Sequence, residues 1–476
     1  MKNLYWLVLL ISLFASAAFA QCEKEPMIEG TGKIIHAKKF SVPFKTNLAS
    51  KMLFKMIGAL TEERGNEMFL SFDASVPGAN WMVKNAEAAV LTVFVDGKYN
   101  QDVILFAGAK KFNYRASLGK FETGEHALSI ALNEARSAPN AKQVKLFSTS
   151  IFPSELALVE NGGDERDFIA LTHAPVLYAR PDTIDEFSDI PLLTYYEIFP
   201  IGENAFKIRY TVIYSNEDGG TQTTALMARW GRATDIEWVY EIEFKDGAIV
   251  SEVYQGANHE TKRFAGKRVF GNHPLIFDVT VNNNFSDTGC SELRSAQLPI
   301  KVDLSKKSRE TIMDENEWTY RVMAQEASRE GRINAAELDA NTIADPRDYL
   351  YAEIYSEPKA AAIALEAENF GGEKFSSDLG NAALRVNRNG FVRIAMRLPK
   401  DSATNFPAAV TVACYAASNN GSTQDGSCQN LRLIKLVRLD QDYLPVVRKL
   451  DSPPQTVKIG EKAVFPLSQR KQAILR

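Results

Sequence analysis

The sequence predicts a mainly β, multi-domain protein in which β-sandwich modules are combined with a few helices. Apolar and polar residues alternate in short stretches such as 126–132 and 206–214, and a period of two is that of a half-buried strand. Turn residues that favour two-residue hairpins stand beside other such stretches, at Asp96-Gly97 and Asp246-Gly247. The chain has 476 residues, a length that corresponds to about three domains.

The N-terminal segment 1–20 has the three parts of a signal peptide. Lys2 supplies the positive charge, residues 4–14 form the apolar core, and an A-x-A cleavage site ends at Ala20. We therefore expect an exported protein, periplasmic or extracellular. No later segment approaches the ~20 apolar residues of a membrane-spanning helix, so no transmembrane anchor is expected.

Composition and charge are those of an ordinary globular protein. Hydrophobic residues make up 45% of the chain, charged residues 24%, and the formal net charge is −4. This balance provides no basic surface for nucleic acid, so we expect no nucleic-acid partner.

The four cysteines are compatible with export, because disulfides form in oxidising compartments. Cys414 and Cys428 flank a loop rich in Ser, Asn and Gly, and we predict that they are joined. Cys22 and Cys290 are left as a second pair that no local feature supports. Gln21 stands where lipidation of Cys22 would require a small residue, so free secretion is favoured. The absence of a C-x-x-C motif argues against a thiolate metal site.

Residues 25–160 are predicted to form an N-terminal β-sandwich-like domain. Strands are expected at 91–95 and 126–132, with the Asp96-Gly97 hairpin directly after the first. One helix is expected over 47–65, where apolar residues repeat every four positions.

Residues 165–300 are predicted to form a central β domain that contains the functional site. Within it, the segment 215–240 places acidic, basic and aromatic side chains close together. The candidate ligand-binding residues from this segment are Asp218, Arg229, Trp230 and Arg232.

The end of that segment is predicted to be a strand of period two. Ile236, Trp238 and Tyr240 would lie on its apolar face, and Asp235 and Glu237 on the opposite face. Two carboxylates this close repel each other unless a cation, a proton or an arginine lies between them.

A divalent cation is one solution for the acidic pair. Calcium or magnesium would suit carboxylate oxygens together with carbonyls such as those of Asn282-Asn283-Asn284, whereas histidine ligands favour zinc. The candidate metal ligands are Asp235, Glu237, His259 and His273. The alternative is that an arginine (Arg209, Arg229 or Arg232) neutralises the acids on a solvated surface, and we favour this alternative for Glu241 and Glu243.

A family resemblance runs through the same segment. The order A-P-V-L-Y at 174–178, P-D at 181–182, D-x-E at 235–237, then a histidine and H-P at 273–274 resembles the vacuolar-sorting-62-type domain. More distantly it is similar to the necrosis-inducing secreted proteins of plant pathogens, in which the Asp and Glu of a D-W-E strand help bind a divalent cation near a glycan-headgroup site. The resemblance therefore implicates Asp235 and Glu237. Ile236 replaces the central Trp of the motif, and nothing in the match implies cytolysis.

Residues 301–345 are predicted to be a helical linker region, with one helix over 308–330. Residues 346–476 are expected to form a C-terminal β-sandwich-like domain. Within it, Asn389-Gly390 favours a hairpin that leads into the strand 392–398.

Three classes of function fit these observations. We expect a secreted protein that binds a glycan or a cell-envelope component, with a bound cation as one means of doing so. One alternative is an extracellular polysaccharide hydrolase or lyase that uses Asp235, Glu237, His259 and His273. The other is a structural or adhesion protein of the cell surface without a discrete site. Neither a G-x-S-x-G motif nor a phosphate-binding glycine loop occurs, so a serine triad or a nucleotide site is not indicated.

Overall fold

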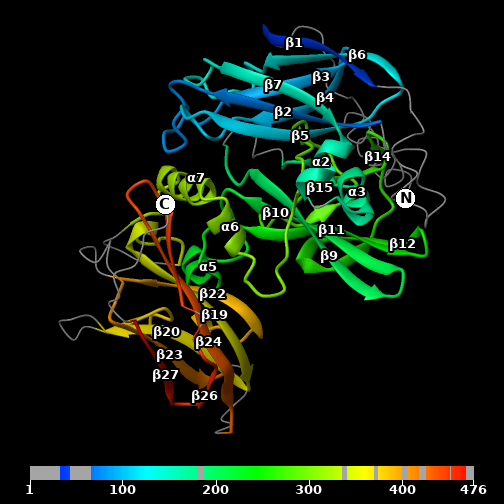
Figure 1. The fold of residues 1–476 in the computed structure, drawn as a ribbon. Coiled ribbons are helices and arrows are strands. Elements are labelled where there is room, and N and C mark those ends of the chain that lie inside the picture. Colours follow the sequence, from blue (N-terminus) through cyan, green and yellow to red (C-terminus); the bar gives the residue numbers. More distant parts are fainter. Residues whose placement is uncertain are drawn as a thin grey trace, which may run out of the picture. The chain divides into compact units, whose positions relative to one another are not determined.

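The structure is a computed structural model that describes residues 33–42, 66–161, 163–180, 187–334, 340–368, 374–398, 406–417, 425–450 and 452–467. Strands arranged in several antiparallel sheets dominate these residues, which confirms the predicted mainly β fold (Figure 1). The predicted signal peptide, Cys22 and the helix over 47–65 lie outside the described residues.

The chain divides into two compact units. The first consists of Met1–Tyr214 and Ile236–Val302, and the second of Ser215–Asp235 and Asp303–Arg476. The domain boundary predicted near residue 300 thus has a counterpart between residues 302 and 303. The N-terminal and central segments, which the sequence assigned to separate domains, belong to one unit. The short segment 215–235 is grouped with the second unit and not with the strands on either side of it.

The N-terminal part of the first unit consists of two antiparallel sheets. Its strands are β1 Lys33–Val42, β2 Glu67–Ser75, β3 Val90–Val95, β4 Lys98–Ile104, β5 Phe112–Lys120, β6 Gly124–Leu132 and β7 Lys145–Pro153. One sheet has the order β1-β6-β3-β4 and the other β5-β2-β7. The hairpin predicted at Asp96-Gly97 is confirmed, because β3 and β4 pair across it.

Residues 294–297 connect this part to the central part of the same unit. The Arg294 guanidinium donates to the carbonyl oxygens of Tyr99 and Asn100 at 2.9 and 2.7 Å. Strand β17 (Arg294–Ser295) also pairs with β8 (Val176–Tyr178) in the central part. The Arg294 hydrogen bonds link segments almost 200 residues apart in the sequence, and together with the strand pairing they explain why the two predicted domains form one unit.

The central part of the first unit packs a six-stranded sheet against a smaller one and a helix. Its other elements are α2 Ser154–Asn161, α3 Glu165–Thr172, β9 Pro191–Gly202, β10 Ala205–Tyr214, β11 Ile236–Lys245, β12 Ala248–Gln255, η1 Ala257–His259, β13 Thr261–Arg263, β14 Arg268–Val269, β15 His273–Asp278, β16 Phe285–Ser286 and β18 Ile300–Lys301. The sheets have the orders β13-β12-β11-β10-β9-β18 and β14-β15-β8-β17, with β16 beside β15. Asp164 caps α3 through a capping box, and Ile169 of this helix shares one core with Tyr210 and Ile276.

A β-bulge at Val239 changes the predicted phase of β11. Tyr240 and Trp238 pair with consecutive residues of β10, so Val239 is the extra residue. Before the bulge the two faces are exchanged: Trp238 lies on the same face as Arg209, and Glu237 lies on the face that leads to the core. The prediction that Trp238 shares the apolar face with Tyr240 is wrong, because one inserted residue inverts the alternation of a strand.

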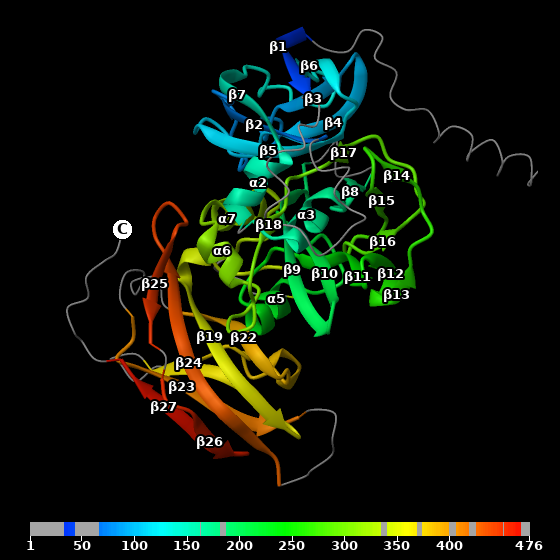
Figure 2. The same ribbon diagram turned by 45° about the vertical axis from the view of Figure 1, so that its right-hand side comes forward.

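The second unit contains a β-sandwich with one apolar core. Its strands are β19 Tyr349–Lys359, β20 Ala361–Glu368, β21 Lys374–Ser376, β22 Gly390–Arg397, β23 Ala409–Ala416, β24 Ser427–Leu439, β25 Pro445–Lys449, β26 Gln455–Lys458 and β27 Lys462–Pro466. One sheet has the order β22-β19-β24-β25, with β26 beside β24, and the other β21-β20-β23-β27 (Figure 2). The predicted disulfide is confirmed, with Cys414 on β23 and Cys428 on β24, and it therefore joins the two sheets.

The second unit also contains helices, of which all but η3 precede the sandwich strands in the sequence. They are α5 Thr223–Trp230, α6 Thr311–Glu315, α7 Trp318–Arg329, and the short η2 Pro346–Asp348 and η3 Ala382–Leu384. The single helix predicted over 308–330 is divided into α6 and α7, and α5 was not predicted. In the part of the chain that the structure describes, no helix is both long enough and apolar enough to cross a membrane.

The hairpin predicted at Asn389-Gly390 is wrong. Strand β22 begins at Gly390 and pairs along its length with β19, whereas Val386 forms an isolated bridge to Ile363 of the other sheet. The chain therefore crosses from one sheet to the other at this turn, so the residues on its two sides cannot pair with each other.

Candidate functional site

Polar side chains gather at one end of two neighbouring strands in the six-stranded sheet of the first unit. Strands β11 and β12 are antiparallel, so the first residues of β11 lie beside the last residues of β12. Glu237 is the second residue of β11 and Gln255 is the last residue of β12. The Gln255 amide donates a hydrogen bond to the Glu237 carboxylate.

His259 joins these residues from the turn that follows β12. Asn258 and His259 both have a φ of +59°, a left-handed conformation that is uncommon for residues other than glycine. His259 Nδ1 lies 3.2 Å from Gln255 Nε2 and 3.9 Å from Glu237 Oε2. The reversal of the chain in this turn thus brings the imidazole beside the edge of the sheet.

Two asparagines from the loop between β15 and β16 contact the same imidazole. Asn282 Nδ2 lies 3.1 Å from His259 Nε2, and Asn284 Nδ2 lies 3.4 Å from His259 Nδ1. Asn283, between them, is fully buried and donates to both carboxylate oxygens of Asp189 at 2.9 Å. This buried contact fixes the loop and with it the positions of the two neighbouring amides.

We refer to Glu237, Gln255, His259, Asn282 and Asn284 as the amide–histidine cluster. The His259 side chain is 53% exposed and that of Glu237 14% exposed, so the cluster is accessible to solvent on the side of the imidazole. A neutral imidazole donates from one ring nitrogen and accepts at the other, and each side-chain amide can do both. The cluster can therefore bind a ligand that carries donors and acceptors side by side.

His273, a predicted metal ligand, lies in a different environment of the first unit. It is 1% exposed, with Nε2 2.8 Å from Glu67 Oε1 and Nδ1 2.7 Å from the carbonyl oxygen of Ala174. Burial disfavours its charged form, but the Glu67 carboxylate and the Ala174 carbonyl outweigh burial and raise the pKa of His273. This histidine is part of a buried ion pair and not of the amide–histidine cluster.

Asp235 belongs to the second unit, where an arginine is its partner. Asp235 Oδ1 lies 3.7 Å from Arg232 Nη1, and both side chains are 2% exposed. Arg232 Nε also lies 3.4 Å from Glu310 Oε1. Glu217 is a further buried acid of this group: burial and repulsion from Asp235 raise its pKa to about 8 despite the attraction of Arg232. Arg232, one of the arginines considered as a partner for Asp235, is therefore its neighbour, but the pair is buried and does not lie on a solvated surface as that alternative supposed.

Glu241 is likewise neutralised by basic side chains, although it is largely buried. Its carboxylate accepts hydrogen bonds from Arg209 Nη2 at 2.8 Å and from Lys207 Nζ at 3.1 Å. The alternative favoured for Glu241 from the sequence thus agrees with the contacts, and both basic residues come from the neighbouring strand β10.

The four predicted metal ligands have different side-chain partners. Glu237 lies beside His259, whereas the side chains of His273 and Asp235 are held in buried ion pairs with Glu67 and Arg232. Over the described ranges, no group of three or more His, Cys, Asp and Glu side chains is arranged to hold a metal ion. The divalent cation therefore stays a prediction from the sequence.

The predicted ligand-binding residues are also divided. Arg229 and Trp230 are the last two residues of α5, and Arg388 contacts Trp230 from another segment. The guanidinium carbons of Arg229 and Arg388 are 4.6 and 4.5 Å from the centre of the Trp230 ring. Asp218 instead pairs with Arg332, with 3.2 Å between Oδ1 and Nη2. The remaining candidate, Arg232, is the buried partner of Asp235 described above.

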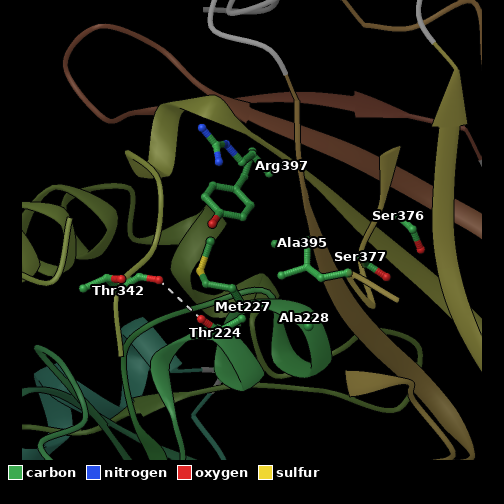
Figure 3. Close-up of a pocket in the computed structure, with 10 residues that line it drawn as sticks. Thr224, Met227, Ala228, Thr342, Ser376, Ser377, Ala395 and Arg397 are labelled. Carbon is green, nitrogen blue, oxygen red and sulfur yellow. Dashed lines mark hydrogen bonds between the residues drawn. The ribbon is translucent and has the colours of Figure 1, made fainter. Parts of the chain in front are cut away.

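Helix α5 also borders a small pocket that is partly open to solvent and encloses little space (Figure 3). The dashed line in Figure 3 marks the hydrogen bond from the Thr224 hydroxyl to the carbonyl oxygen of Thr342, at 3.3 Å. The lining residues are Thr224, Met227, Ala228, Thr342, Tyr349, Ser376, Ser377, Leu379, Ala395 and Arg397. None of the site residues predicted from the sequence lines this pocket.

Comparison with known proteins does not assign the chain to a family. No protein-family model matches it, and no curated protein matches it either. One solved structure, the C-terminal domain of EclA, described as a sugar-binding protein, aligns with 27% of this chain and 84% of its own length. The aligned residues are 16% identical and the TM-score is 0.15, a level of similarity from which nothing follows about fold or function.

Sequence reasoning missed Gln255 and Arg388. Gln255 had a usable signal, because counting outward from the Asp246-Gly247 hairpin places the end of β12 near Glu237. Arg388 had none, since it is separated from Trp230 by 158 positions (388 − 230) and their contact depends on the packing of α5 near β22.

Proposed function

We propose that this protein is exported and binds a glycan, and that the amide–histidine cluster contacts the hydroxyl groups of the sugar. The observation that supports this proposal is the grouping of one carboxylate, one imidazole and three amides, in which His259 is exposed to solvent, Asn282 is partly exposed, and Gln255 and Asn284 are buried behind them. Each sugar hydroxyl donates one hydrogen bond and accepts others, so neighbouring hydroxyls require donors and acceptors that alternate over a few ångströms. Amides and carboxylates provide this pattern.

The rigidity of the cluster supports binding of a defined ligand. Glu237 and Gln255 are fixed by strands, and Asn282 and Asn284 by the buried Asn283 between them. A site that is formed before the ligand arrives loses less conformational entropy on binding. Export agrees with the N-terminal segment 1–20 and with the disulfide of the second unit, a bond that is typical of oxidising compartments.

The test is glycan-array binding by the purified mature protein, followed by calorimetric titration of the best ligand. We expect Glu237→Gln, His259→Ala and Asn282→Ala each to weaken binding about tenfold, the effect of losing one hydrogen bond to a charged or polar group. Glu243→Gln is the matched control, because Glu243 is on the same strand but on the opposite face. It should bind like the wild type.

Two results would overturn the proposal: binding to no glycan on the array, or equal losses in the Glu237 and Glu243 variants. The bound glycan is also analysed for cleavage. Shortened or unsaturated products would assign the same residues to a hydrolase or lyase, the alternative that the sequence left open.

A further inference from the structure

A second polar group, in the second unit, surrounds the indole of Trp230. Arg229 precedes this tryptophan at the end of α5, and Arg388 reaches it from the segment before β22. Both guanidiniums lie over the ring, at 4.6 and 4.5 Å from its centre. All three side chains are partly buried, so the two cations are partly removed from water.

The two guanidiniums are not fully used by the protein. Arg229 Nε and Arg388 Nη1 are buried and have no hydrogen-bond partner within the described part of the chain. Burial lowers the pKa of Arg229. It also lowers the pKa of Arg388 to about 10; attraction by Glu310 counteracts this shift, whereas repulsion from Arg309, Arg229 and Arg232 adds to it. Burying cations without compensating anions is unfavourable, so an incoming anion would be stabilised here.

We propose that Arg229, Trp230 and Arg388 form an oxyanion site that binds a carboxylate or sulfate group of an acidic saccharide. The planar guanidinium fork matches the two oxygens of such a group. The oxyanion chemistry is inferred from the arginines alone, whereas the saccharide as its source rests on the proposed function. The site lies in the second unit and is distinct from the amide–histidine cluster of the first.

A structural role accounts for only part of the hydrogen-bonding capacity and charge of Arg388. Its Nη2 donates to the backbone carbonyl of Arg229 and so caps the C-terminus of α5. The helix end supplies a negative charge of about half a unit, less than the two positive charges of Arg229 and Arg388 together. The contact of Arg229 with Trp230 is a cation–π contact, which leaves the edge of the guanidinium able to donate.

The chain contains a matched arginine–tryptophan pair that should not bind anions. The Arg209 guanidinium carbon lies 5.4 Å from the centre of the Trp238 ring, but Nε and Nη2 donate to Glu241 at 3.0 and 2.8 Å. This pair reproduces the contact of an arginine with an indole and differs in that a carboxylate already neutralises the arginine.

The first test is titration of the mature protein with sodium sulfate, in which binding is measured by tryptophan fluorescence and by calorimetry. Sodium chloride at equal ionic strength is the reference. We expect saturable sulfate binding that Arg229→Met weakens about tenfold, the loss of one charged hydrogen-bond partner. Arg209→Met should bind like the wild type. Trp230→Phe should remove the fluorescence change. Arg388→Lys, which retains the charge but not the fork, should bind more weakly than the wild type.

The second test identifies the source of the oxyanion by competition. A sulfated oligosaccharide and an oligogalacturonate are each used to displace sulfate, and displacement that Arg229→Met weakens would support the acidic saccharide. If sulfate binds but neither saccharide displaces it, an acidic saccharide is not the source of the oxyanion, and the proposal of an oxyanion site is retained. A response equal to that of chloride, or undiminished binding by an Arg229→Met protein of unchanged melting temperature, would overturn the site itself. Failure of the proposed function is seen separately, in the Glu237→Gln titration with glycan.

Discussion

His273 and Glu67 form a buried ion pair in which His273 Nε2 lies 2.8 Å from Glu67 Oε1. Glu67 begins β2 in the N-terminal part of the first unit, and His273 begins β15 in the central part. Each side chain is almost fully excluded from solvent. The pair therefore links two sheets through a charge interaction that depends on protonation of the imidazole.

We expect this pair to make the stability of the first unit depend on pH. The pKa of His273 is raised above its ordinary value of 6.5, so the folded state binds more protons than the unfolded state above pH 6.5. The contribution to the free energy of unfolding is complete below pH 6.5 and is lost as the pH rises through the raised pKa. Urea unfolding between pH 6.5 and 8.5 measures the effect. Glu67→Gln should flatten this dependence, and an unchanged slope would contradict the assignment.

Glu217 predicts a second pH dependence, in the second unit. Its pKa is raised to about 8 by burial and by repulsion from Asp235, so the folded state retains a proton that the unfolded state loses above about pH 4.5. Stability should therefore fall as the pH rises from about 5 to 8. The free energy of unfolding of Glu217→Gln should equal that of the wild type near pH 5 and exceed it at pH 8.5, by a few kcal/mol at most.

The control for this measurement is Asp442→Asn, which removes an exposed carboxylate from the same unit. Its unfolding free energy should follow the wild type at every pH. A Glu217→Gln profile parallel to that of the wild type would show that Glu217 does not retain its proton.

Gly231 should be intolerant of a side chain for two separable reasons. It ends α5 with a φ of +62°, and a Cβ atom there would lie 2.3 Å from Cγ of the buried Arg393. Gly380 has a similar φ of +78°, and a Cβ atom there would meet none of the described atoms within 4 Å. Gly380→Ala should cost about 1 kcal/mol from backbone strain, and Gly231→Ala about 1–3 kcal/mol more from the clash. Equal losses in urea unfolding would argue against the contact with Arg393.

The predicted cation is tested by thermal unfolding with chelator and with calcium, magnesium or zinc. Because His273 and Asp235 are each held in a buried ion pair, we expect chelator to leave the melting temperature unchanged. A bound ion at a hundredfold excess over its Kd would stabilise the protein by about 2.7 kcal/mol, which is easily measured. If chelator instead lowers the melting temperature of the wild type but not that of Glu237→Gln, the result would support a bound cation with Glu237 and His259 as its ligands.

The sequence alone identified the parts of this protein whose causes are local. The hairpins at Asp96-Gly97 and Asp246-Gly247 form as predicted, because a two-residue turn fixes the register of the strands beside it. The bridge between Cys414 and Cys428 was also predictable, since only a short loop separates them. Of the candidate site, Glu237 and His259 were identified, and they lie on adjacent segments joined by one hairpin.

The tertiary structure decided what depends on distant segments. The bulge at Val239 exchanged the faces of β11, because an extra residue is accommodated by the neighbouring strand and leaves no mark in the local pattern. Segment 215–235 lies between two paired strands in the sequence, yet it is grouped with the second unit. Arg388 meets Trp230 only through the packing of that unit. Such contacts form because together they bury more apolar surface and neutralise more charge than the alternatives, a comparison over the whole chain that no short stretch of sequence contains.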